Sequence, residues 1–262
     1  YKRQIINNGG KKMENRVVLV TGGASGIGKG IVRKFAQRGC QVIIFDVQDE
    51  KGETLAKELC DQGKKVVYKH VNLFNIDEIK RAYAWIKEQY GKLDYAMNNA
   101  GFGIPAKPLD ECTTEDVNRV IGICLIAVAN CMIEEVKMMK EAGFGRIINT
   151  TSGAGILGIK GNSIYCAAKH GVVGITKAAA LDYATYNVTI NAIAPGAIET
   201  ELVSSLKEIA PDAYRQAEKS NPAGRLGQPE DIANAVMFLC EDASSFINGV
   251  VIPVDSGCVA GK

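Results

Sequence analysis

Short apolar runs rich in valine and isoleucine alternate with longer helical patterns along almost the whole chain. The strand-like runs are RVVLVT (16–21), QVIIFD (41–46), KVVYKHV (65–71), LDYAMN (93–98), GRIINT (145–150), VTINAIA (188–194) and GVVIPV (249–254). Helical patterns lie between them, at about 26–38, 49–62, 75–90, 114–140, 163–186 and 229–240. Strands that alternate with helices predict a mostly parallel sheet. We therefore expect a doubly wound α/β fold of about seven strands, with helices on both faces.

The chain shows no internal repeat and no low-complexity linker, so we expect residues 13–262 to form a single domain. Residues 1–12, YKRQIINNGGKK, precede the first strand-like run and look like a tag remnant or a flexible extension. Residues 196–228 break the alternation and contain Pro211 and Pro222. A long excursion at the carboxyl edge of a sheet is typical of a substrate lid.

The charge of the chain indicates what kind of partner it binds. Its 31 basic and 29 acidic residues leave a net charge of +2, without long runs of one sign. This pattern argues against a nucleic-acid site and against a membrane-surface patch. No apolar segment reaches the ~18 residues that span a bilayer, and the N-terminus is too polar for a signal peptide. We expect a small-molecule partner.

The cysteines form no CxxC pair and mostly lie in apolar runs, which indicates reduced, buried thiols and a cytoplasmic protein. They are Cys40, Cys60, Cys112, Cys124, Cys131, Cys166, Cys240 and Cys258. Only His70 and His170 could assist them as metal ligands, and neither has the spacing for it. We predict no metal site.

A glycine-rich turn, TGGASGIGKGIV, follows the first strand-like run directly. Gly22, Gly26 and Gly28 would let the backbone approach a pyrophosphate, and the start of the next helix offers free N–H groups. The same glycines could form only a tight turn. Their place between the first strand and the first helix favours a Rossmann-type dinucleotide site.

Asp46 ends the second strand, 18 residues after Gly28. A carboxylate at this place accepts hydrogen bonds from the adenosine ribose hydroxyls and repels a 2′-phosphate. Ser25 and Val47, where a base could receive that phosphate, are neutral. We therefore predict NAD(H) over NADP(H). The alternative is that Asp46 only caps the turn beside Asp49.

Tyr165 and Lys169 stand four positions apart in NSIYCAAKHG, in a predicted helix. Residues at i and i+4 share a helix face, so the phenol and the ammonium are neighbours. As an exposed pair they would contribute only a few tenths of a kcal/mol. In a site, the ammonium could stabilise the phenolate, whose formation near pH 7 requires ~4 kcal/mol for a phenol of ordinary pKa ~10.

Several motifs together resemble those of the compact, single-domain short-chain dehydrogenases/reductases. TGGASGIG (21–28), NNAG (98–101), Ser152, the Tyr165 and Lys169 pair and PGAIET (195–200) occur in that family's order and spacing. The resemblance covers residues 16–257. It implies a dinucleotide-dependent oxidoreductase with Ser152, Tyr165 and Lys169 as catalytic residues.

The resemblance also extends the cofactor site beyond the glycine turn and Asp46. It places the NNAG turn and residues 72–73 on the adenosine side and residues 195–200 around the nicotinamide. The whole predicted set is Gly22, Ser25, Gly26, Ile27, Gly28, Asp46, Asn72, Leu73, Asn99, Ala100, Gly101, Tyr165, Lys169, Pro195, Gly196, Ile198 and Thr200.

In the implied reaction, a hydride passes between NAD(H) and a secondary alcohol or ketone. Tyr165 would exchange the proton, Ser152 would hydrogen-bond the substrate oxygen, and Lys169 would also hold the nicotinamide ribose. One position departs from the family: Cys124 stands where a helix asparagine usually joins the proton relay. A thiol is a weak hydrogen-bonding group, so a protein that binds NAD(H) as a sensor or scaffold remains an alternative.

The sequence constrains the identity of the substrate and the oligomeric state less than it constrains the cofactor site. The 196–228 segment contains the apolar side chains of Leu202, Leu206, Ile209 and Tyr214, and GILG lies at 155–158. These residues indicate a largely apolar alcohol of a cyclic or steroid-like kind. The family is usually tetrameric, so we expect a homotetramer that pairs helices 114–140 and 163–186. Small residues on the second helix would allow close approach: Ala167, Ala168, Gly171 and Gly174. An epimerase of the extended relatives, the other alternative, needs a larger carboxyl-terminal domain.

Overall fold

The structure, a computed structural model, describes residues 13–261, without the side chains of residues 202, 206 and 213. The predicted extension at 1–12 lies outside the described residues. Between 13 and 261, no helix has the length and apolar character to cross a membrane.

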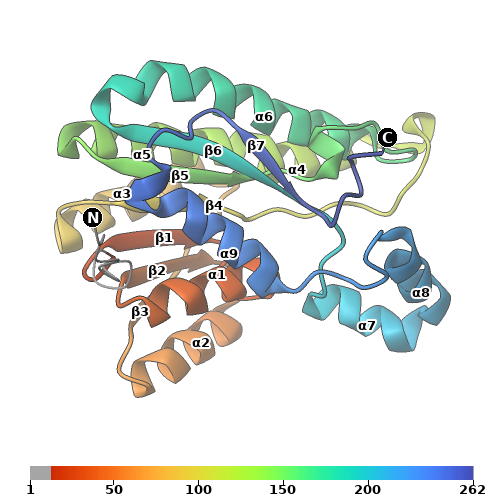
Figure 1. Ribbon diagram of the computed structural model, residues 1–262, viewed down its shortest axis with the longest axis horizontal. Helices are drawn as coiled ribbons and strands as arrows, with labels where there is room; N and C mark the ends of the chain where they lie inside the picture. Colours follow the sequence, from red (N-terminus) through yellow and green to blue (C-terminus); the bar gives the residue numbers. More distant parts are fainter. Residues whose placement is uncertain (1–12, 262) are drawn as a thin grey trace, which may run out of the picture.

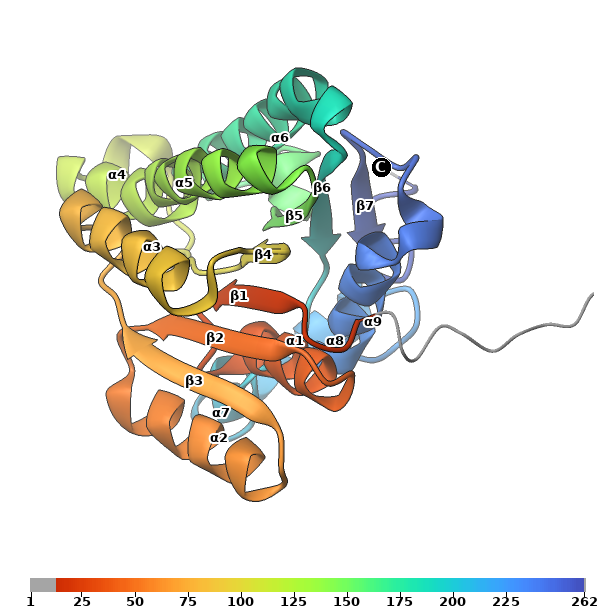
Figure 2. The same cartoon turned by 90° about the vertical axis from the view of Figure 1, so that its left-hand side faces the viewer.

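A seven-stranded sheet forms the centre of the molecule, in the order β3-β2-β1-β4-β5-β6-β7 (Figures 1 and 2). All neighbouring strands are parallel, which confirms the predicted doubly wound α/β fold. The strands are β1 (Val17–Thr21), β2 (Gln41–Asp46), β3 (Lys65–His70), β4 (Tyr95–Asn98), β5 (Gly145–Thr150), β6 (Val188–Pro195) and β7 (Val251–Val254).

Helices cover both faces of this sheet, and a separate apolar cluster lies under each layer (Figure 2). One face carries α3 (Ile76–Tyr90), α4 (Thr114–Ile121), α5 (Ala127–Ala142) and α6 (Ser163–Tyr183). The other carries α1 (Gly26–Gln37), α2 (Asp49–Asp61) and α9 (Pro229–Cys240). Because the five inner strands are buried on both faces, their sequences are mostly continuous apolar runs and do not alternate, whereas the edge strands β3 and β7 are only partly buried.

The direction of the strand order reverses between β1 and β4, which are paired at the centre of the sheet. The register places Val20 opposite Met97 and Asn98 opposite Asn149, so the carboxyl ends of β1, β4 and β5 meet at one edge. Ligands of open α/β sheets bind at such a switch point. The fold therefore directs attention to the turns that follow these strands.

The predicted helix at 114–140 is not a continuous α-helix. It consists of α4 and α5 joined by a π-helical turn over Gly122–Ile126. Phe74 packs against this turn so closely that a Cβ at Gly122 would lie 2.9 Å from its ring. π-turns occur often at functional sites, and this one contains Cys124.

The 196–228 segment contains two helices that the sequence pattern did not predict. They are α7 (Glu201–Ile209) and α8 (Pro211–Ser220), which project beyond the sheet on the side where β6 ends (Figure 1). Pro211 stands in the first turn of α8, where its missing N–H has no cost. A parallel bridge between Ile198 and Gly227 closes the base of the segment.

The small residues of α6 were expected to allow close contact between subunits, but they do not all lie on one exposed surface. Ala168 is buried within the chain, and a Cβ at Gly171 would lie 2.7 Å from Leu125. These two residues therefore serve packing inside the subunit. Ala167 and Gly174 are exposed.

Candidate active site

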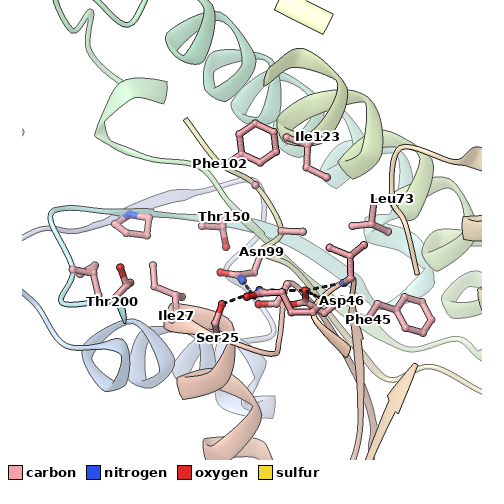
Figure 3. A pocket seen from close by; sticks show the side chains of 18 of the residues that line it. Ser25, Ile27, Phe45, Asp46, Leu73, Asn99, Phe102, Ile123, Thr150 and Thr200 are labelled. Carbon is pink, nitrogen blue, oxygen red and sulfur yellow. Dashed lines mark hydrogen bonds between the residues drawn. The ribbon is translucent and has the colours of Figure 1, made fainter. Parts of the chain in front are cut away.

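A cleft of about 1170 Å³ opens at the carboxyl edge of the sheet. It exceeds the roughly 300–1,000 Å³ of ordinary ligand pockets, so it has room for a dinucleotide and a second molecule. Every predicted site residue except Gly28 lines it, and these residues come from the ends of six strands, β1 to β6, from the start of α1 and from α6. Figure 3 shows Ser25, Asp46 and Asn99 at one part of the cleft and Phe102 and Ile123 across from them.

The glycine turn has the geometry of a phosphate cradle. Gly22 and Gly26 have φ values of +63° and +52°, a region that side chains disfavour. A Cβ at Gly28 would lie 2.0 Å from the carbonyl oxygen of Gly22. Gly28 thus lies behind the turn and allows it to close, while α1 starts at Gly26 and directs its free N–H groups into the cleft. The turn fits a pyrophosphate.

Asn99 holds this turn against the end of β4. Its side-chain Nδ2 donates to the carbonyl oxygens of Thr21 and Gly22, both at 3.2 Å. The backbone N–H groups of Asn99 and Ala100 donate to Thr21 Oγ1, at 3.0 and 3.1 Å. The NNAG turn and the glycine turn are therefore one rigid unit.

Asp46 is held from behind while it lines the cleft. Its Oδ1 accepts hydrogen bonds from the N–H groups of Val47 (2.8 Å) and Gln48 (3.1 Å), and its Oδ2 accepts one from Ala24 N (3.0 Å). The capping that we considered as an alternative is thus present, together with exposure to the cleft. Since a carboxylate accepts about four hydrogen bonds, Oδ2 keeps capacity for a ligand hydroxyl.

The adenosine end of the cleft contains groups that the sequence did not single out. Lys51 and His70 line it, but Lys51 Nζ lies 2.8 Å from Glu201 and His70 Nδ1 lies 2.7 Å from Asp49. Phe74, which follows Leu73, is half-exposed beside them. These side chains follow the carboxyl ends of strands, which is the signal that could have identified them.

The side chain of Asn72, predicted to contact the cofactor, is partly engaged in a hydrogen bond within the protein. Its Oδ1 accepts a hydrogen bond from Phe74 N at 3.0 Å, within the turn before α3. Its backbone N–H donates to Glu78 at 2.9 Å. The amide oxygen is therefore engaged locally, so the Nδ2 group remains as the hydrogen-bonding group toward the cleft.

Tyr165, Lys169 and Ser152 lie together in the same cleft, next to the cradle. Lys169 is buried, with Nζ 2.8 Å from the carbonyl oxygen of Thr150 and 5.6 Å from the centre of the Tyr165 ring. Ser152 is hydrogen-bonded to Tyr165. The carbonyl of Lys169 accepts a hydrogen bond from Thr151 Oγ1 at 3.0 Å, which ties α6 to the end of β5.

The protonation of the pair differs from what charge alone predicts. Burial, with a smaller effect of Cys124, raises the pKa of the Tyr165 phenol to about 12, and the hydrogen bond with Ser152 acts in the opposite direction. Burial lowers the pKa of the Lys169 ammonium. In the protein alone, desolvation of the phenolate outweighs the hydrogen bond with Ser152, so Tyr165 keeps its proton.

Cys124 lies under the site and is fully buried. Its Sγ is 3.2 Å from the carbonyl oxygen of Phe102. A Cβ at Gly101 would lie 3.1 Å from this sulfur and 3.7 Å from Lys169 Nζ. The thiol therefore lies close to the NNAG turn and to Lys169, and it bonds to the backbone of the cleft wall.

The apolar part of the cleft comes from residues other than those we expected. Phe102, Ile123 and Val203 line it, whereas Ile209 and Tyr214 do not. Ile209 points to solvent, and the Tyr214 hydroxyl is bonded to Glu199. Helix formation in the 196–228 segment directs these two side chains away.

A glycine cradle at the switch point of a parallel sheet, joined to a partly exposed tyrosine and serine and a buried lysine, defines the class of dinucleotide-dependent oxidoreductases. Among residues 13–261, no group of three or more potential metal ligands comes together.

Comparison with known proteins places the chain within that class. A family model described as enoyl-(acyl carrier protein) reductase matches residues 22–259. A cyclohexanol dehydrogenase from Acinetobacter sp. (strain SE19) is 39% identical, covering 93% of this chain and 95% of the relative. A cis-4-hydroxycyclohexanecarboxylate dehydrogenase from Sinomonas cyclohexanicum is 37% identical, covering 96% and 99%. This chain belongs to the short-chain dehydrogenase/reductase family.

A solved structure agrees with this assignment. The crystal structure of a levodione reductase has a TM-score of 0.89 and 34% sequence identity, covering 95% of this chain and 99% of that one. The protein is thus an oxidoreductase that acts on CH–OH groups with an NAD(P) cofactor.

Proposed function

We propose that this protein transfers a hydride between NAD(H) and a secondary alcohol or ketone whose body is apolar and cyclic. The observation that carries the proposal is the meeting of Tyr165, Lys169 and Ser152 beside the glycine cradle in one cleft. When bound, the oxidised dinucleotide supplies a hydride acceptor with a positively charged ring.

The three side chains have separate tasks in this proposal. Tyr165 exchanges a proton at its Oη with the substrate oxygen, and Ser152 donates a hydrogen bond to that oxygen. Lys169, fixed by the carbonyl of Thr150, places a positive charge beside the phenol and holds the ribose hydroxyls. Because burial keeps the pKa of Tyr165 at about 12, Lys169 and the positive charge of the bound cofactor must together favour the phenolate.

Asp46 supports NAD(H) over NADP(H). Its carboxylate is fixed by three backbone N–H groups at the end of β2, where it would meet the ribose hydroxyls and repel a 2′-phosphate. The nearby cation of Lys51 is engaged with Glu201.

The test of cofactor choice is the ratio of kcat/KM with NAD⁺ to that with NADP⁺. We expect wild type to favour NAD⁺ and Asp46→Ala to lower the ratio by about tenfold or more, because a charge repulsion of ~1.4 kcal/mol is lost. Glu50→Gln, which neutralises an exposed acid of α2 that does not line the cleft, is the matched control. A preference for NADP⁺ that Asp46→Ala leaves unchanged would refute the assignment.

The substrate class is supported by the apolar cleft wall and by the printed names of two relatives, which act on cyclohexane alcohols. Phe102 and Ile123 offer an apolar surface near Tyr165, and Lys169 is the one cationic side chain that lines this part of the cleft among the described residues. A panel of cyclic and linear secondary alcohols at fixed NAD⁺, read by NADH absorbance, tests it. We expect cyclohexanols to exceed linear alcohols of equal carbon number in kcat/KM.

A non-catalytic NAD(H)-binding role is the second candidate, because Cys124 occupies the relay position and its thiol is bonded to Phe102. This candidate predicts NADH binding without turnover of any alcohol in the panel. The complete set of Ser152, Tyr165 and Lys169 favours the enzyme.

We propose that residues 13–262 act as one domain in which 196–228 forms the lid, and that four copies assemble. Exposed Val117, Ile126, Ile133 and Leu181 on α4 to α6 support contact between these helices. Light scattering tests the assembly, and a monomeric mass contradicts it. The eight free cysteines support a reducing, cytoplasmic location.

A further inference from the structure

A carboxylic acid lies in the core of the protein, beneath the active site. Glu135 of α5 is completely buried, between α3 and the central strands. Its Oε1 accepts a hydrogen bond from the Tyr83 hydroxyl at 2.7 Å, and its Oε2 accepts one from Asn98 Nδ2 at 2.9 Å. Neither the cradle nor the catalytic residues use it, and a buried acid is costly to keep without a purpose.

The Asn98 amide continues this contact into a chain of buried polar groups. Its Nδ2 also donates to Asn149 Oδ1 at 3.0 Å, and Asn149 Nδ2 donates to Thr176 Oγ1 at 2.9 Å. Asn98 Oδ1 has no partner among the described residues. The orientation of this amide therefore depends on its two acceptors, Glu135 and Asn149.

Each end of this chain lies directly next to the site. Asn98 precedes Asn99, whose side chain holds the glycine turn. Asn149 precedes Thr150, whose carbonyl holds the Lys169 ammonium. Thr176 lies on α6 two helical turns after Lys169. Movement of the Asn98 amide would therefore reach both the cofactor cradle and the catalytic lysine.

The carboxyl group is able to change its proton without leaving a buried donor unpaired. When it is ionised, it accepts from both Tyr83 and Asn98. When it is protonated, its O–H can donate to the Tyr83 oxygen, and the Tyr83 hydroxyl can turn to Cys131, which is within hydrogen-bonding reach. In both states Asn98 keeps an acceptor at Oε2, but the charge-assisted bond of the ionised state is about twice as strong.

Nothing in the surroundings forces Glu135 into one state. The titratable groups that face it are Tyr83 from α3 and Cys131 from its own helix, and burial raises the pKa of both above their ordinary values. The central strands present the amides of Asn98 and Asn149, and α6 presents the Thr176 hydroxyl. Burial raises the pKa of Glu135 itself to about 7, against the two hydrogen bonds.

We propose that Glu135 is a positioning residue whose ionised carboxylate fixes Asn98, and through it the cradle, so that the dinucleotide binds more tightly when Glu135 has lost its proton. The proposal rests on the proposed dinucleotide site. The difference between a charge-assisted and a neutral hydrogen bond, of which only a part reaches the ligand, predicts a change of about two- to fivefold in affinity.

The experiment is an NADH fluorescence titration between pH 5.5 and 8.5. Wild type should bind about two- to fivefold more tightly at high pH, with a midpoint near neutrality. Glu135→Gln, which imitates the protonated acid, should remove this step and bind weakly at every pH. Glu134→Gln, which changes the adjacent, only partly buried acid that pairs with Lys137, should behave like wild type.

Tyr83→Phe provides a test that does not change Glu135. The hydrogen bond from the Tyr83 hydroxyl lowers the pKa of Glu135. Loss of this bond should therefore move the midpoint of the NADH-binding curve to higher pH. A merely structural role of Glu135 would not shift that midpoint. Hydrogen exchange of the amides at 98–101, compared between wild type and Glu135→Gln at each pH, needs no cofactor. We expect the amides at 98–101 to exchange more slowly in wild type than in Glu135→Gln at high pH, and at equal rates at low pH.

Two outcomes separate the proposals. If wild type and Glu135→Gln show the same pH dependence in binding and in exchange, the role of Glu135 is refuted. If wild type binds no NADH at any pH, the proposed function fails, and the exchange measurement still decides whether Glu135 positions the 98–101 turn.

Discussion

Replacement of Glu135 by glutamine should change the stability of the protein in a pH-dependent way. In the folded protein, burial raises the pKa of this group from 4.5 to about 7. Between these values the folded state holds a proton that the unfolded state has released, so stability falls as pH rises through this window. At ~1.36 kcal/mol per pH unit, the full loss is about 3 kcal/mol.

Glutamine has no proton to lose, so the variant should not follow this decline. We expect the difference in unfolding free energy, variant minus wild type, to grow by about 2 to 3 kcal/mol between pH 5 and pH 8.5. Urea unfolding of both proteins at the two pH values measures it, and all other titrating groups cancel in the difference. Glu134→Gln should give a flat difference, because that side chain is only partly buried and its partner Lys137 is exposed to solvent. A difference for Glu135→Gln that is equal at both pH values would show that the acid does not titrate in this range.

Three further changes test the site itself. Gly28→Ala places a Cβ 2.0 Å from Gly22 O, so the turn must open and NADH affinity, measured by fluorescence, should fall at least about tenfold. Tyr165→Phe should lower kcat by roughly 10²- to 10⁴-fold while the Kd for NADH stays within about twofold; a normal kcat would remove Tyr165 from the mechanism. Cys124→Asn should raise kcat and alter its pH profile, and an unchanged rate would indicate that the relay is already intact by another route.

The fold was predictable because its signals are local. Each strand carries its own apolar run, and the glycine turn follows β1 within the same short stretch of sequence. The interruption of the helix at Gly122–Ile126 was not predictable, since it depends on Phe74 packing against Gly122 from another part of the chain. α7 and α8 were missed for a different reason: the 196–228 segment, which contains two prolines, was predicted as a lid excursion without helices, although Pro211 is tolerated in the first turn of a helix.

The site residues that belong to a sequence motif were predictable. The residues that form the apolar wall of the cleft were not, because each comes singly from a different segment. Phe102 and Ile123 belong to no motif; they line the cleft because the NNAG turn and the π-turn bring them there. Ile209 and Tyr214 looked suitable by composition, but the helices of the 196–228 segment direct them elsewhere.

By itself the sequence determined the parallel α/β architecture and the glycine turn, because periodicity and short spacings carry this information along the chain. The grouping of Ser152, Tyr165 and Lys169 was implied by the resemblance to the family. Only the tertiary structure decided the environment of these groups. It surrounds Tyr165 so that desolvation outweighs the hydrogen bond with Ser152. It also turns Glu135, one of two adjacent acids on a helix, into a core residue, through partners 52 and 37 residues away. Burial and pKa depend on which distant segments pack together, and no local pattern records that.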